Sequence, residues 1–126
     1  MKMNEYQVLA TRTKRSYANP HYATAVLSMG LAGEAGEVVD YLKKVVGHDH
    51  PLDKDVLKKE LGDVLWYVAA LCDQHEISMG DVAQANVDKL MARYPEGFST
   101  DDSLSRRDQR ESDAKSVSQQ TNVPAC

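Results

Sequence analysis

Apolar residues recur along most of this chain at spacings of three and four positions, and no stretch keeps the two-residue alternation of a strand. This pattern predicts helices, which we expect over residues 4–16, 22–46, 53–74 and 78–94. The predicted fold class is therefore all-α, an antiparallel helical bundle of about four helices.

Local signals mark several of the predicted helix ends. Gly47 is a suitable stop for the second helix, and Asp53 is a suitable N-cap for the third. Ser78 and Asp81 resemble a capping box at the start of the fourth helix, and Pro95 ends it. Residues 47–51 form a loop by composition.

The composition changes near residue 99. Residues 1–98 carry the helical pattern and form the predicted domain, whereas residues 99–126 are polar with few apolar anchors. Such a segment cannot bury enough apolar surface to offset its ordering entropy, so we expect a disordered tail. Leu104 is the residue best suited to tether its first part.

Two pairs of carboxylates are the clearest candidates for chemistry. Glu34 and Glu37 form one pair and Glu60 and Asp63 the other, each with the three-residue step that places both side chains on one side of a helix. Both pairs lie in otherwise apolar segments, where unpaired negative charge is costly. Carboxylates gathered there would need a cation, and oxygen ligands favour Mg²⁺, with Mn²⁺ as the alternative.

A weak internal repeat puts the two pairs in phase. Residues 34–42 and 60–68 share the pattern E-x-G-[DE]-V-[VL]-x-Y-[LV]. On a helical wheel of about 100° per residue, both pairs follow the same edge of an apolar stripe. We therefore expect two antiparallel neighbours to turn these edges toward a common pocket, although surface charges beside a core are the alternative. Close approach of backbone or ligand would explain the glycines inside these helices, Gly33, Gly36 and Gly62.

The fourth predicted helix offers a complementary surface. Asn86, Lys89 and Arg93 lie within about 60° of one another on the wheel. An amide with two cations suits phosphate oxygens or a departing pyrophosphate, while an ordinary solvated face explains the same pattern equally well. Lys44 could also reach an anion near the acidic pocket.

Aromatic residues near the acidic pairs are candidates for contact with a base. Tyr41 and Tyr67 share the carboxylate edge, whereas Trp66 and His21 are less well placed by sequence. A tyrosine at such an angle is more often a core-edge residue whose hydroxyl has a polar partner.

Several familiar sites are absent from the sequence. His48 and His50 have no companion cysteine pair, so a zinc site there is not expected. The chain has no Glu-x-x-His motif of di-iron bundles, no P-loop and no G-x-G-x-x-G motif.

Length and charge narrow the class of protein further. The 126 residues suffice for one domain, and the formal net charge of -4 argues against nucleic-acid and anionic-membrane partners. We expect no secretory signal and no membrane span. Cys72 and Cys126 make no disulfide framework, so a cytoplasmic location is expected.

The two carboxylate pairs and the fourth predicted helix together resemble a known family. Glu34 and Glu37, followed by Glu60 and Asp63, resemble the MazG family of nucleoside triphosphate pyrophosphohydrolases, part of the all-α NTP pyrophosphatase group. Residues 86–98 also look like the end of a MazG domain, so the resemblance covers residues 22–98. The single short domain is similar to compact MazG-like proteins, including phage-encoded ones, for which the location would be the host cytoplasm.

The resemblance implies hydrolysis of a nucleoside triphosphate to its monophosphate and pyrophosphate. It implies Mg²⁺ held by the four carboxylates, and assembly as a homodimer or homotetramer whose subunits complete each other's sites. We expect Glu37, ahead of Glu34, to take the proton of the attacking water, while Glu60 and Asp63 act mainly as ligands.

Other functions fit the same sequence. A dUTPase-like enzyme or a phosphoribosyl-ATP hydrolase could use the same scaffold. A non-catalytic helical module with a metal site would release no pyrophosphate from any nucleotide. The preferred base and sugar are not determined by the sequence.

Overall fold

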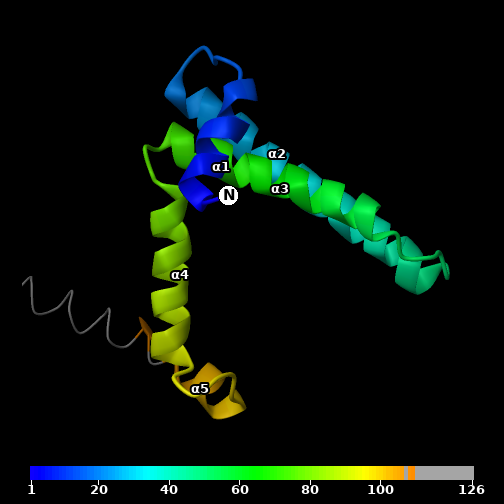
Figure 1. The fold of residues 1–126 in the computed structure, drawn as a ribbon, viewed down its shortest axis with the longest axis vertical. Helices are drawn as coiled ribbons and strands as arrows, with labels where there is room; N and C mark the ends of the chain where they lie inside the picture. Colours follow the sequence, from blue (N-terminus) through cyan, green and yellow to red (C-terminus); the bar gives the residue numbers. More distant parts are fainter. Residues whose placement is uncertain (107, 110–126) are drawn as a thin grey trace, which may run out of the picture. The chain divides into compact units, whose positions relative to one another are not determined.

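The computed structural model describes residues 1–106, 108 and 109, and these residues form helices and no strand (Figure 1). The all-α fold class is thereby confirmed. The chain divides into two compact units, residues 1–81 and 82–126. No helix in the described part of the chain is long and apolar enough to cross a membrane. The helices are α1 (Met3–Ala10), the 3-10 turn η1 (Thr11–Thr13), α2 (Pro20–Gly47), α3 (Lys54–Gln74), α4 (Met79–Arg93) and α5 (Thr100–Ser105).

In the first unit, α2 and α3 form an antiparallel hairpin. Asn19 caps α2 by accepting a hydrogen bond from the Tyr22 amide at 2.8 Å, and Pro20 occupies the first turn, where no amide is needed. Asp53 caps α3 by accepting from the amides of Asp55 and Val56. The expected second and third helices are confirmed to within a few residues.

The loop between these helices is fastened by a tyrosine. The Tyr41 hydroxyl donates to the Asp53 carbonyl at 2.9 Å and accepts from the Asp53 amide at 2.8 Å. Tyr41 is therefore a core-edge residue whose hydroxyl has backbone partners, the alternative considered for it above. This contact joins the C-terminal part of α2 to the start of α3.

The first helix ends earlier than expected. The pattern predicts a helix to residue 16, but α1 stops at Ala10 and the chain continues as η1. Trp66 of α3 explains the change, because its indole N–H donates to the Ala10 carbonyl at 3.0 Å and the Thr13 hydroxyl at 2.8 Å. The Lys14 amide pairs with the Thr11 carbonyl instead, which is the 3-10 pattern.

The core of the first unit lies at one end of the hairpin. Its fully covered side chains are on α2, on α3 and at the start of α4, and Tyr6 and Ala10 of α1 pack against them. α1 also caps α4, since the Asn4 side chain accepts from the Gly80 amide at 2.7 Å. The Ser78 hydroxyl accepts from the Asp81 amide at 3.1 Å, which confirms Ser78 as a cap. The buried residues are Ala23, Leu27, Ala69, Ala70, Cys72 and Met79.

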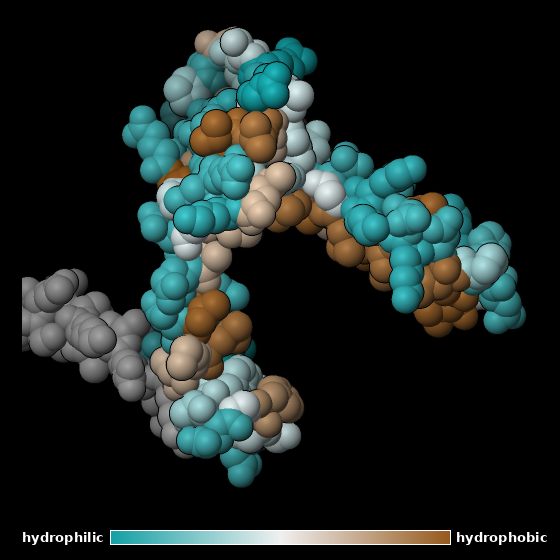
Figure 2. All heavy atoms as spheres, in the orientation of Figure 1, coloured by the Kyte–Doolittle hydropathy of each residue, from teal (hydrophilic) through white to brown (hydrophobic). Residues whose placement is uncertain are grey.

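The far part of the hairpin has no core of its own. No residue from 28 to 68 is buried. Large apolar side chains are instead exposed along one face of α2 and α3, which Figure 2 shows as brown surface following the hairpin. We name this surface the apolar hairpin face; its members are Val39, Leu42, Val46, Leu61 and Leu65.

The second unit contains the rest of α4 and α5. Ser99 caps α5 by accepting from the Asp102 amide at 3.1 Å. The Arg93 side chain binds Asp108 through two hydrogen bonds of 2.6 and 2.7 Å. Part of the expected disordered tail is thus helical, held by polar contacts rather than by Leu104, which is 79% exposed. The rest of that prediction, residues 107 and 110–126, lies outside the described residues.

Candidate metal centre

Three of the four expected carboxylates come together on the hairpin. One oxygen from each of Glu34, Glu60 and Asp63 lies within 4.8 Å of the others. Glu34 and Glu60 are half-buried, and Asp63 is exposed. We call these three residues the carboxylate cluster.

Antiparallel pairing of α2 and α3 explains why residues so far apart in sequence meet here. Gly30 faces Tyr67 and Tyr41 faces Asp53, so positions on α2 rise as positions on α3 fall. This register puts the turn that carries Glu34 beside the turn that carries Glu60 and Asp63. Three of the four carboxylates in the in-phase pairs therefore form one group in space.

Glu37 lies outside this group. It is exposed, one turn beyond Glu34, and its negative charge contributes to the raised pKa of Lys44. The largest cause of that raised pKa is the hydrogen bond from Lys44 to Asp40, whose oxygen lies 2.6 Å from the Lys44 nitrogen. Lys43 also binds Asp40, and the two lysines lower the pKa of Asp40 to about 2. Lys44 is thus held by Asp40 rather than by the carboxylate cluster.

Gly30 makes the close approach that was expected at other glycines. A Cβ atom at Gly33, Gly36 or Gly62 would meet nothing within 4 Å among the described residues. The expectation that another part of the backbone approaches these glycines closely is therefore wrong. A Cβ atom at Gly30 would lie 2.0 Å from Cε1 of Tyr67. The absence of a side chain at Gly30 lets the Tyr67 ring lie against α2.

Two tyrosines lie near the carboxylate cluster. Tyr67 follows Asp63 by one helical turn, and Gly30 precedes Glu34 by one turn, so the Tyr67 ring lies next to the cluster. Tyr6 of α1 is near enough for the charge of Asp63 to act on it. Burial is the larger cause of the raised pKa of Tyr6, and the charge of Asp63 is the second.

The remaining aromatic candidates have other surroundings. Trp66 donates its indole N–H to α1 and η1, as described above, and stacks edge-on against Tyr67 at 4.8 Å between ring centroids. His21 is exposed in the first turn of α2. Neither is placed at the carboxylate cluster by a contact of the described residues.

The three candidates on α4 belong to the second unit. Asn86 and Lys89 are exposed, and Arg93 is engaged by Asp108. The positive charge of Lys89 contributes to the lowered pKa of Asp108, after the larger effect of the hydrogen bond from Arg93. Lys89 and Arg93 thus both act on the carboxylate of Asp108, and their expected contact with phosphate stays a prediction.

Sequence reasoning missed Tyr6, Gly30 and the segment of residues 14–19 that follows η1. Gly30 and Tyr67 could have been paired from the sequence, because they lie four positions outside Glu34 and Asp63 in an antiparallel register. No such signal exists for Tyr6, whose position depends on how α1 crosses α3.

The donor set suits a hard divalent cation. Carboxylate oxygens are the ligands that Mg²⁺ and Mn²⁺ accept, and histidine and cysteine are absent from the cluster. The spacing of its oxygens approaches the separation of ligands around one Mg²⁺ ion, about 3 to 4 Å. The residues present therefore fit such an ion.

Comparison with known proteins bears on the same segment. Residues 24–98 match the family described as the MazG nucleotide pyrophosphohydrolase domain. The chain is 40% identical over 75 residues to Gene 37 protein of Mycobacterium phage L5, covering 56% of this chain and 66% of that protein. It is 33% identical over 73 residues to YvdC of Bacillus subtilis (strain 168), covering 51% of this chain and 69% of YvdC. The match thus spans just under two thirds of the phage relative, and no solved structure matches the chain.

Proposed function

Because this chain belongs to the MazG nucleotide pyrophosphohydrolase family, we propose that it hydrolyses a nucleoside triphosphate to the monophosphate and pyrophosphate. The observation that carries the proposal is the carboxylate cluster, which gathers Glu34, Glu60 and Asp63 within the matched segment. Three carboxylates that close together repel one another unless a cation or a proton intervenes.

Glu34, Glu60 and Asp63 would hold the divalent ion, with Mg²⁺ preferred over Mn²⁺. When bound, the ion would lower the pKa of a coordinated water and neutralise charge on the phosphate oxygens. Glu34 and Glu60 are half-buried, so packing in the hairpin would restrict their side chains and help to position the ligand oxygens.

Glu37 would act as the general base. It is exposed and lies one turn from Glu34, so its carboxylate is not committed to the cluster. In the proposed reaction the water oxygen bonds to the α-phosphorus and the bond to the bridging oxygen of the β-phosphate breaks. Glu37 takes the proton of the water, and pyrophosphate leaves.

Other side chains would bind the substrate. Tyr67, next to the cluster, would contact the nucleotide. His21 and Lys44 are further candidates for binding the substrate, and both lie farther from the cluster residues along the sequence. Asn86, Lys89 and Arg93 would meet phosphate oxygens, for which Arg93 would have to exchange Asp108 for substrate.

We also propose that the functional form is a homo-oligomer, a dimer or a tetramer. The apolar hairpin face exposes Val39 by 66%, Val46 by 81% and Leu61 by 51%, on a hairpin with no buried residue between 28 and 68. A contiguous apolar surface of this kind is typical of an association site. A second copy covering it would give this half of the hairpin a core.

A panel of nucleoside triphosphates with Mg²⁺, scored for monophosphate and pyrophosphate, tests the activity. We expect Asp63→Ala and Glu37→Gln each to lower turnover by about 100-fold or more while helical content is retained. Asp55→Ala is the matched control, since the Asp55 side chain is exposed on the same helix and binds Lys58 at the surface.

The outcomes separate the rival functions. Turnover of dUTP alone, or of phosphoribosyl-ATP alone, would identify a related hydrolase on the same scaffold. Absence of pyrophosphate from every nucleotide would contradict catalysis and favour a non-catalytic module. Full activity in Asp63→Ala would remove the carboxylate cluster from the mechanism.

A further inference from the structure

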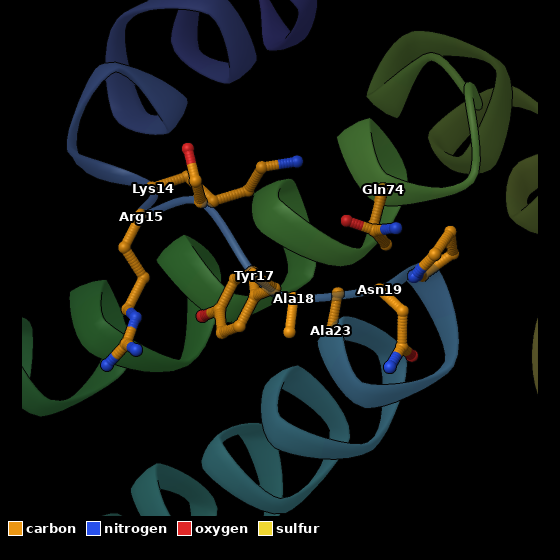
Figure 3. Close-up of a pocket in the computed structure, with 9 residues that line it drawn as sticks. Lys14, Arg15, Tyr17, Ala18, Asn19, Ala23 and Gln74 are labelled. Atoms are coloured by element: carbon orange, nitrogen blue, oxygen red, sulfur yellow. The ribbon is translucent and has the colours of Figure 1, made fainter.

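A pocket of about 350 Å³ lies where residues 14–19 cross the hairpin (Figure 3). This segment connects η1 to α2, and it lines the open pocket together with Pro20 and Ala23 of α2 and Gln74 of α3. The lining is mostly polar, and it belongs entirely to the first unit. The residues assigned above to the proposed reaction do not line it.

Several polar groups of the pocket have no partner among the described residues. The Gln74 amide is half-buried and makes no hydrogen bond there, and Ser16 likewise makes none. The Arg15 guanidinium contacts only the face of Tyr17, at 5.4 Å from the ring centroid. By contrast, Lys14 is neutralised by Asp73. The pocket therefore offers an amide, a hydroxyl and an aromatic ring to a ligand.

The pocket and the carboxylate cluster lie on the same side of the hairpin. Ala23 precedes Glu34 by 11 positions and Gln74 follows Asp63 by 11 positions, so both helices give the same separation, about 16 Å at 1.5 Å per residue. On the wheel, Ala23 falls within about 20° of Glu34, and Gln74 within about 20° of Asp63. Tyr67 and Gly30 lie between the two sites.

Arg15, in the segment of residues 14–19, extends in the direction that leads from the pocket to the carboxylate cluster. In Figure 3, Arg15 extends along α3 away from Gln74, which is the direction of Asp63. The carboxylate side chains and a bound ion would occupy part of this backbone separation, and the remainder is comparable to the length of a nucleoside monophosphate, so a base in the pocket would leave the α-phosphate at the cluster.

We propose that this pocket binds the base of the nucleotide whose phosphates lie at the carboxylate cluster, an inference that rests on the proposed function. Gln74 supplies both a donor and an acceptor to the polar edge of a base, and Tyr17 supplies an apolar face. Arg15 approaches the α-phosphate from the side of the pocket. A phosphate is the poorer occupant of the pocket itself, because Asp73 neutralises the other cation there.

Binding of products tests the proposal without requiring turnover. The probes are the four common deoxynucleoside monophosphates, which carry a base, and inorganic pyrophosphate, which carries none, each titrated with Mg²⁺ by NMR. We expect Gln74→Leu and Tyr17→Leu each to weaken monophosphate binding about tenfold and to leave pyrophosphate binding unchanged. Gln84→Leu, on α4 outside the pocket, is the control and should bind like the unmodified chain.

Each outcome of these titrations either supports or overturns the base pocket. Equal monophosphate binding in both variants, with unfolding temperatures preserved, would overturn the base pocket while pyrophosphate release could still uphold the proposed function. Equal weakening of monophosphate and pyrophosphate would make the pocket a phosphate site and overturn it as well. Selective weakening in a chain that releases no pyrophosphate would support the base pocket as a binding site and refute only the catalysis.

Discussion

Gly30 shows how one missing side chain shapes the region beside the carboxylate cluster. An alanine Cβ atom there would lie 2.0 Å from Cε1 and 2.3 Å from Cζ of Tyr67, so the ring would have to move. At Gly33, one turn along the same helix, the Cβ atom would meet nothing within 4 Å. The two glycines therefore form a matched pair with opposite expectations.

We expect Gly33→Ala to raise the free energy of unfolding by up to about 1 kcal/mol, through helix propensity alone. Gly30→Ala should be about 1 to 3 kcal/mol less stable than Gly33→Ala, because it displaces the Tyr67 ring. Urea unfolding at fixed protein concentration measures both. In a Tyr67→Ala background the penalty at Gly30 should vanish, and its persistence would show that the ring is not its cause.

The pair of Arg93 and Asp108 gives a prediction about pH. The hydrogen bonds from Arg93 hold the pKa of Asp108 below its ordinary value of about 3.9. Because the pKa is lower in the folded state, the stabilisation is present above that ordinary value and is lost as the pH falls through the folded one. An NMR titration of the Asp108 carboxyl should show a depressed midpoint that Arg93→Ala restores, whereas an ordinary midpoint in the unmodified chain would contradict the contact.

At the scale of elements, the hairpin is closed by a side chain rather than by the loop sequence. The Tyr41 hydroxyl exchanges two hydrogen bonds with the backbone of Asp53, the N-cap of α3. It thereby fixes the start of α3 relative to α2, and with it the register that assembles the carboxylate cluster. From the sequence alone, Tyr41 was expected at the carboxylate edge, but the hydrogen-bond partner of its hydroxyl could not be identified.

Tyr41→Phe should therefore lower the free energy of unfolding by about 1 to 3 kcal/mol, the value of two hydrogen bonds. Hydrogen exchange should show the effect first at the amides of the loop and of the first turn of α3. Tyr22→Phe is the control, since the Tyr22 side chain is 53% exposed and its hydroxyl has no hydrogen bond among the described residues. Equal effects of the two substitutions would argue against the fastening role of Tyr41.

Helix ends were predictable where the signal is local. Asp53 and Ser78 cap the helices that they were expected to cap, because a cap depends on its own next three residues. The end of α1 was not predictable, because Trp66 takes the Ala10 carbonyl from 56 positions away. Likewise, the contact of Arg93 with Asp108 spans 15 positions, outside any helical pattern.

At the scale of the whole molecule, the site is mounted on the half of the hairpin that lacks a core. Among the described residues, every buried one lies in residues 23–27 or 69–79, whereas the carboxylate cluster lies between these ranges. The apolar hairpin face is the surface whose covering would supply the missing core. Assembly and activity should therefore be linked.

Val39→Glu tests that link. Val39 is 66% exposed, so a charge there should not disturb an isolated chain, but it should dissociate an oligomer built on the apolar hairpin face. Sedimentation velocity should show a shift to the monomer, with loss of pyrophosphate release. Val8→Glu, at a residue of α1 that is 68% exposed, should retain the assembly. An unchanged oligomer in Val39→Glu would assign the interface to another surface.

The candidate site was predictable in part. The sequence placed two carboxylate pairs in phase on neighbouring helices, and three of the four meet in space. Glu37 does not join them, and its charge acts on Lys44 farther along α2. The close contact at Gly30, rather than at Gly33, depends on the register of two helices, which no single helical pattern contains.

The sequence by itself determined the helices, most of their caps and the common edge of the carboxylates, because these follow from periodicity and from neighbours within a few positions. Only the tertiary structure decided which carboxylates cluster, where α1 ends and where a pocket opens beside residues 14–19. Those features depend on contacts between residues far apart in the chain. The free energy of such contacts depends on how whole helices pack against one another. The pattern of residues within a single helix does not contain that information.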